Sequence, residues 1–143
     1  MEKQSVLTIG LLADVMPEVF FDLKNGQGTI LYNHNITEVM VIKGEDGEIE
    51  ITTDKKKSTG KMFKYDSVRV EYPKTADNIF ATLLTAKYSA TKESKLINEY
   101  QSATLGLIDE SHKTPYEEFL VDRLAIRDFV DQDCETYNIP IDL

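Results

Sequence analysis

The fold class follows from residues 37–52, which read Thr37-Glu38-Val39-Met40-Val41-Ile42-Lys43-Gly44-Glu45-Asp46-Gly47-Glu48-Ile49-Glu50-Ile51-Thr52. The first seven residues are rich in β-branched side chains, and the last five alternate apolar and polar side chains with a period of two. An Asp-Gly pair between two such runs is typical of a tight β-hairpin turn. The sequence therefore predicts an antiparallel hairpin here.

Further strands are predicted on both sides of this hairpin. Residues 19–23 and 29–32 are apolar runs separated by Asn25-Gly26-Gln27-Gly28, which favours a second hairpin. Residues 67–72 alternate until Pro73, which has no N–H to donate to a strand ladder. We therefore expect an antiparallel β-meander in the N-terminal half, although residues 11–23 fit equally a short helix that starts at Pro17.

The period of the apolar residues changes to 3.6 after Thr75, which predicts helices. One stripe comprises Ile79, Phe80, Leu83, Leu84 and Lys87, and a second comprises Leu96, Ile97, Tyr100, Ala103 and Leu107. Gly106 is expected to end the second helix, because glycine readily adopts the left-handed backbone of a helix terminus.

A third helix is predicted from Thr114 to about Glu135. Thr114 would be the N-cap, Pro115 the first helical residue and Glu117 the partner in a capping box, and Pro140 closes the segment. The short connection at 108–113 predicts that the second and third helices form an antiparallel αα-hairpin.

These patterns predict an α+β fold in a single domain, residues 1–143. A β-rich part (1–73) precedes a helical part (74–143), and the three helices are expected to pack on one face of the sheet.

Composition excludes several classes of protein. The chain has 143 residues, 25 acidic and 16 basic, and its net charge of −9 argues against a sequence-specific nucleic-acid binder. A single cysteine, Cys134, excludes an internal disulfide framework and a multi-cysteine zinc site. No apolar run is long enough to cross a membrane, so we expect a cytoplasmic protein that binds no membrane.

The charge is distributed unevenly. Residues 108–143 contain ten acidic and three basic residues, whereas 52–64 contain five lysines against Asp54. The segment that starts at residue 54 does not match a phosphate-binding loop. That motif needs glycine at position 55 and serine or threonine at position 62, where this chain has Lys55 and Met62. The lysines of this segment are expected either to keep a hairpin tip in solvent or to dock on an acidic surface; we select them as interface candidates: Lys55, Lys56, Lys57 and Lys61.

Catalytic, metal and cofactor sites are not expected. His34 and His112 are predicted in loops, and the acids around His112 are too close in sequence to converge on a metal ion. The sequence has no nucleophile elbow, and the acids beside Cys134 should raise the pKa of its thiol. We therefore expect a non-enzymatic protein with no cofactor.

The last helix is predicted to have two apolar faces. A broad arc contains Tyr116, Phe119, Leu120, Leu124, Ile126, Val130, Cys134 and Tyr137. A narrower opposite stripe contains Val121, Ala125 and Phe129. Because an edge helix of a monomer needs one apolar face, two stripes indicate a helix that is either sandwiched within its own fold or covered by a partner. We select the second stripe as an interface candidate.

Arg123 and Arg127 lie one turn apart within the broad arc. Arg127 is spaced to pair with Asp131 along the helix, with both arginine stems packed on apolar neighbours. Alternatively, the two guanidinium groups form a clamp for a carboxylate or phosphate.

Residues 86–100, Ala86-Lys87-Tyr88-Ser89-Ala90-Thr91-Lys92-Glu93-Ser94-Lys95-Leu96-Ile97-Asn98-Glu99-Tyr100, and residues 116–123, Tyr116-Glu117-Glu118-Phe119-Leu120-Val121-Asp122-Arg123, carry a resemblance. In the order and spacing of its residue types, this helical half resembles small proteins of tailed bacteriophages and of prophages of gut bacteria. The resemblance implies a virion component or assembly factor that works through repeated protein contacts.

The leading functional hypothesis is an assembly or interaction protein that binds a protein partner or copies of itself as a homo-oligomer. In that case the basic loop of one copy would meet the acidic end of the next, head to tail. Two alternatives stay open. One is a small anionic-ligand binder or enzyme that uses Arg123 and Arg127, and the other is an acidic regulatory protein that occupies a basic groove of a partner.

Overall fold

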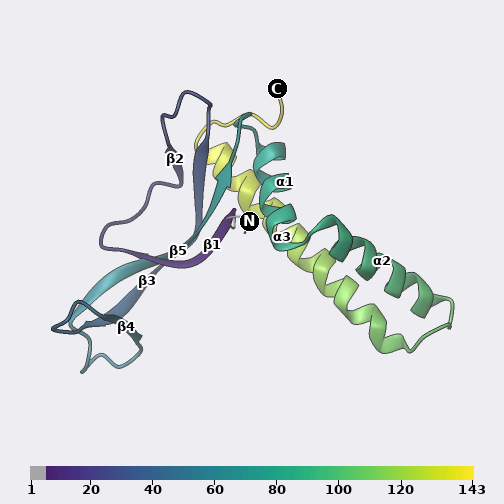
Figure 1. Cartoon of the computed structure of the whole chain (residues 1–143), viewed down its shortest axis with the longest axis horizontal. Helices are drawn as coiled ribbons and strands as arrows, with labels where there is room; N and C mark the ends of the chain where they lie inside the picture. The colour runs from purple at the N-terminus through teal and green to yellow at the C-terminus, as the bar shows by residue number, and fades with distance from the viewer. Residues whose placement is uncertain (1–5) are drawn as a thin grey trace, which may run out of the picture. The chain divides into compact units, whose positions relative to one another are not determined.

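The computed structural model describes residues 6–143, which divide into two compact units at Tyr72/Pro73 (Figure 1). The first unit is an antiparallel sheet and the second is helical, so the α+β class is confirmed. The packing of the helices on the sheet stays a prediction.

The sheet contains five strands: β1 (Leu7–Ala13), β2 (Phe20–Asp22), β3 (Ile30–Lys43), β4 (Ile49–Thr52) and β5 (Gly60–Val70). Both predicted hairpins are present, β2 with β3 and β3 with β4. The chain order differs from the spatial order, because β5 lies between β3 and β1. Segment 11–23 holds the end of β1 and all of β2, so it contains no helix.

Strand β3 is longer than expected, because it runs through Asn33-His34-Asn35, for which the sequence favoured a loop. The pairing of β3 with β5 shifts between His34 and Thr37, and Asn35 adopts a left-handed backbone with φ of 53°. A bulge of this kind absorbs one extra residue and lets the strand continue. His34 is consequently buried within the strand, 7% exposed, which corrects its predicted place in a loop.

Asp66 holds the bulges of two strands at once. Its Oδ2 accepts a hydrogen bond from Asn35 Nδ2 at 3.2 Å, and its Oδ1 accepts one from the Gly10 N–H at 3.0 Å. Gly10 lies where the pairing of β1 with β5 also shifts, with φ of 78°. One carboxylate on the central strand therefore stabilises irregularities in both of its neighbours.

The helical unit contains α1 (Ala76–Lys87), α2 (Ala90–Thr104), a 3-10 turn η1 (Glu110–Lys113) and α3 (Thr114–Thr136). Thr75 and Ser89 are the N-caps of α1 and α2, since each side chain accepts a hydrogen bond from the backbone N–H three residues later. The prediction that Thr114 is an N-cap is wrong. Helix α3 continues directly from η1, and Asp109 caps that turn instead.

Both α2 and α3 end in the same hydrogen-bonded motif. After α2, the Leu107 N–H donates to the Ser102 carbonyl and Gly106 adopts φ of 76°. After α3, the Ile139 N–H donates to the Cys134 carbonyl and Asn138 adopts φ of 58°. These are Schellman motifs, which satisfy carbonyls that a helix end leaves unpaired, and the expected stop at Gly106 is confirmed.

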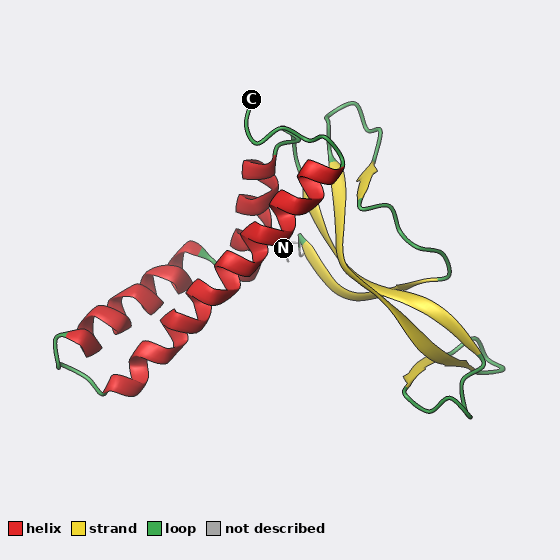
Figure 2. Cartoon of the chain, turned by 180° about the vertical axis from the view of Figure 1, so that it is seen from behind, coloured by secondary structure: helices red, strands yellow, loops and turns green. Residues whose placement is uncertain are grey.

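Helices α2 and α3 form the predicted antiparallel hairpin (Figure 2). Aromatic rings join them: the Tyr100 and Tyr116 centroids are 5.0 Å apart. Tyr88, which follows α1, packs edge-on against Phe119 of α3 at 4.8 Å. Such pairs contribute roughly 0.5–1.5 kcal/mol beyond the area they bury.

Candidate protein-interaction site

Helix α3 buries a narrower face than the sequence predicted. Phe119, Ile126, Val130 and Cys134 are buried, as expected for members of the broad arc. Leu120, Leu124 and Tyr137 of the same arc are 39%, 62% and 51% exposed, so only part of the arc is buried. The physical reason is that one helix contacting its neighbours along one side covers only part of an arc this broad.

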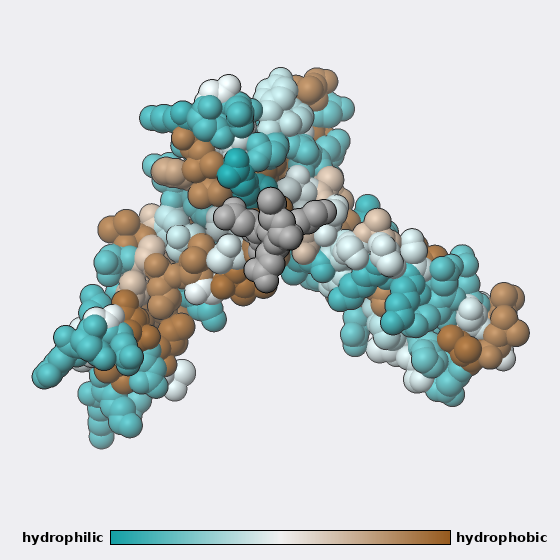
Figure 3. All heavy atoms as spheres, viewed as in Figure 1, coloured by the Kyte–Doolittle hydropathy of each residue, from teal (hydrophilic) through white to brown (hydrophobic). Residues whose placement is uncertain are grey.

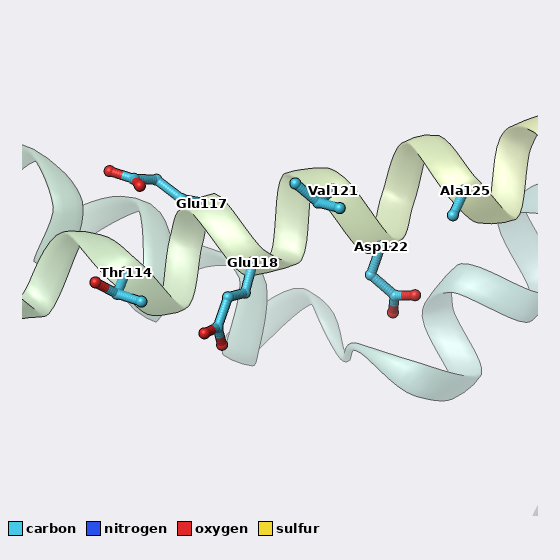
Figure 4. A pocket seen from close by; sticks show the side chains of 6 residues that line it. All are labelled: Thr114, Glu117, Glu118, Val121, Asp122 and Ala125. Atoms are coloured by element: carbon cyan, nitrogen blue, oxygen red, sulfur yellow. The ribbon is translucent and has the colours of Figure 1, made fainter.

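The narrower stripe of the sequence analysis lies on the exposed side. Val121 is 69% exposed, Ala125 is also exposed, and Phe129 is half-buried. Val121 and Ala125 line a groove of about 410 Å³, to which Phe129 does not belong. This α3 groove is defined by Thr114, Glu117, Glu118, Val121, Asp122 and Ala125 (Figure 4).

Three carboxylates flank the apolar floor of the groove. Glu118 and Asp122 lie on one side of α3 and Glu117 on the other (Figure 4). From the sequence, Glu117 is expected to be a capping residue, and none of these three acids is predicted as a site residue. Their spacing around Val121 is nevertheless visible in a helical projection, because residues three and four apart share one side of a helix.

Asp122 is already held by two neighbouring side chains. Its Oδ2 accepts a 2.6 Å hydrogen bond from the Tyr88 hydroxyl and lies 3.5 Å from Lys87 Nζ. The hydrogen bond to Asp122, together with partial burial, raises the pKa of Tyr88 to about 12. Glu117 and Glu118, in contrast, form no ion pair with any residue that the structure describes.

The basic loop, residues 54–61, has a backbone held in place. The Asp54 side chain accepts the Lys56 N–H at 2.9 Å, and the Asp54 carbonyl accepts the N–H groups of Lys57 and Ser58. The loop does not close a hairpin, because it joins β4 to β5 on opposite sides of β3.

The lysines of this loop differ in their contacts. Lys61 lies 3.2 Å from Glu38, whereas Lys55, Lys56 and Lys57 are exposed and form no ion pair within residues 6–143. Three cations on a fixed turn are therefore available to a partner.

Arg127 is engaged inside the helical unit. Its Nε donates to Asp131 at 3.0 Å, as the spacing predicted, and its NH2 donates to Asp77 of α1 at 2.8 Å. Arg127 and Arg123 both lie over the Phe80 ring, at 4.9 and 5.1 Å from its centroid. An anionic ligand at this pair would have to displace two carboxylates from Arg127.

Cys134 and the two histidines give no sign of a catalytic or metal centre in the described chain. Burial, together with the nearby carboxylates of Asp131 and Asp133, raises the pKa of the Cys134 thiol to about 11. His112 lies in η1 and is exposed. Between residues 6 and 143, no three His, Cys, Asp or Glu side chains cluster closely enough to hold a metal ion.

A second apolar surface lies at the closed end of the α2–α3 hairpin (Figure 3). Leu105 and Leu107 are 74% and 73% exposed, on both sides of Gly106. This hairpin tip is separate in sequence from the α3 groove, so a substitution at the tip is a control for a substitution in the groove.

No family model, no curated protein and no solved structure matches this chain. None of the helices in the described part is both long enough and apolar enough to cross a bilayer.

Proposed function

We propose that this chain is a non-enzymatic assembly protein that associates with copies of itself through the outer face of α3. An assembly role is also what the resemblance of the helical half to tailed-phage proteins implies.

The supporting observation is a run of exposed apolar residues in an acidic helix. Leu120, Val121 and Leu124 are all exposed, and Leu124 lies three residues from Val121 and four from Leu120, so it neighbours both on the helix surface. Isolated exposed apolar residues are ordinary, whereas contiguous ones rimmed by polar groups mark interaction surfaces. Val121 belongs both to this exposed run and to the α3 groove.

The test measures mass in solution by size exclusion with light scattering, at several protein concentrations, for the natural chain and for Val121→Asn, which makes the groove floor polar without adding charge. We expect a concentration-dependent oligomer, and at least a tenfold weaker association for the variant. A tenfold change corresponds to about 1.4 kcal/mol.

Leu107→Asn is the matched control, since it places the same amide at a similarly exposed position of the hairpin tip. It should leave association unchanged. A strict monomer at every concentration, or equal effects of the two substitutions, would overturn the proposal.

A further inference from the structure

The α3 groove fits a particular kind of side chain. Its floor is apolar, at Val121 and Ala125, and its rim carries carboxylates on both sides. A lysine suits such a surface, because its alkyl stem packs on apolar atoms while its ammonium group reaches polar groups at the edge. Glu117 and Glu118 make no ion pair in the described chain that a lysine would have to displace.

The chain itself contains a matching group of lysines. Residues 52–64 carry five lysines against one aspartate, and Lys55, Lys56 and Lys57 follow one another at an exposed turn. Their backbone is held by Asp54, and the Thr59 N–H donates to the Val41 carbonyl of β3 at 2.9 Å. A loop fixed before binding loses less conformational entropy on docking than a mobile one.

An apolar surface beside this loop resembles the groove in character. Ile49 and Ile51 of β4 are both 43% exposed, and they lie two residues apart on one face of the strand. The β4 end of the sheet thus presents apolar side chains next to lysines, as the groove presents apolar side chains next to carboxylates.

We infer that the partner of the α3 groove is a second copy of this chain, whose basic loop docks there with its lysines between Glu117 and Glu118. This inference rests on the proposed function and names the docking segment. Each copy has one groove and one loop, so the contact is head to tail and either closes into a ring or propagates. The contact is small, and small contacts are weak and transient when isolated, so closure or repetition would strengthen the assembly.

The contact is largely electrostatic and should therefore weaken with salt, since exposed charges are screened over about 8–10 Å at ordinary ionic strength. The decisive test reverses charge on each side separately. One variant is Lys56→Glu/Lys57→Glu, which places like charges in loop and groove. The other is Glu117→Lys/Glu118→Lys, with the same consequence.

Neither variant should associate with itself in sedimentation velocity, and each should lose at least tenfold in affinity. Mixing the two should restore association, because every contact between unlike copies is again complementary. Lys92→Glu/Lys95→Glu on α2 is the control for the loop variant, with the same change in net charge as Lys56→Glu/Lys57→Glu, and should associate like the natural chain. Circular dichroism checks that each variant is folded, since two lysines near the start of α3 disfavour that helix end.

The outcomes separate this inference from the proposed function. If Val121→Asn abolishes association while both charge reversals leave it intact, α3 is the interface but the basic loop is not its partner. If the reversed pair fails to associate on mixing, the docking inference is overturned as well. If the natural chain is monomeric at every protein and salt concentration, the proposed function is overturned, and the docking inference with it.

Discussion

Tyr88 and Asp122 join α3 to the end of α1 through a single short hydrogen bond of 2.6 Å. Because the pKa of Tyr88 rises from 10.0 to about 12 on folding, the protonated phenol stabilises the folded state. The sign follows directly: this contribution is complete below pH 10 and is lost as the pH rises through about 12.

Tyr88→Phe should therefore lower the free energy of unfolding near neutral pH, and its difference from the natural chain should shrink between pH 10 and 12. Urea unfolding followed by circular dichroism measures this. Tyr72→Phe, which removes an exposed phenol, is the control and should leave the free energy of unfolding near neutral pH unchanged. A constant difference across the range would contradict the assignment.

Arg127 and Arg123 share one aromatic ring but have different roles. Arg127 pairs with Asp77 and Asp131 and joins α1 to α3, whereas Arg123 has only the Phe80 ring among the described residues. The Oδ1 atom of Asp131 is buried without a hydrogen bond. Removing Arg127 would leave this carboxylate without its cation.

We expect Arg127→Met to destabilise the fold by about 1–2 kcal/mol, because it removes two partly exposed ion pairs and a cation–π contact. Arg123→Met should cost about 0.5–1 kcal/mol. Thermal unfolding of both variants measures the contrast. If Arg127→Met instead keeps full stability and abolishes stabilisation by a phosphate compound, the anion-binding alternative would be supported.

At the scale of elements, the C-terminal tail completes the start of α1. The N–H groups of Ala76 and Asp77 donate to the carbonyls of Pro140 and Ile141 at 2.9 and 3.0 Å. The next N–H, of Asn78, is bound by the Thr75 side chain. The donors that a helix start leaves unpaired are thus satisfied by the neighbouring Thr75 and by the distant C-terminal tail.

Removal of residues 140–143 should destabilise the chain by about 2 kcal/mol, because two backbone donors lose their acceptors while the Ile139 N–H that ends α3 is kept. A chain that ends at Ile141 is the control: it keeps both acceptors and places a terminal carboxylate at the positive end of the helix. Urea unfolding should separate the two truncations. Equal stabilities would show that the tail is not an effective cap.

Gly106 allows a direct measurement of the α2 terminus. Its φ is 76°, and a Cβ at this position would meet no atom within 4 Å. Gly106→Ala should therefore cost about 1 kcal/mol through backbone strain alone. Gly106→Asn should cost less, since asparagine tolerates this conformation, as Asn138 does after α3. A neutral Gly106→Ala would show that the turn changes its conformation.

For the whole molecule, the open question is how the two compact units unfold. The sequence predicts a single domain, and each unit has a buried core, with Tyr32 and Val68 in the sheet and Leu83 and Val130 among the helices. One domain should unfold in one cooperative transition. Residue-resolved NMR during urea unfolding should give the same midpoint for both units, and separate midpoints would indicate two domains.

Periodicity and local hydrogen-bonding chemistry determined most of the elements. The runs around Asp46-Gly47 yielded a hairpin, the 3.6-residue stripes yielded three helices, and Gly106 ended α2. These features depend on neighbours within a few residues, so the sequence alone determines them. The partner of Arg127 four residues away was predictable for the same reason.

Only the tertiary structure decided which strands are neighbours and which apolar residues are covered. The placement of β5 between β3 and β1, the continuation of β3 through His34 and the capping of α1 by the tail all join residues distant in the chain. A helical projection assigns Leu124 and Val130 to the same arc, yet Leu124 is exposed and Val130 buried. Burial depends on what packs against a face, and the α3 groove lies on a side of that helix where Val121 and Ala125 stay exposed.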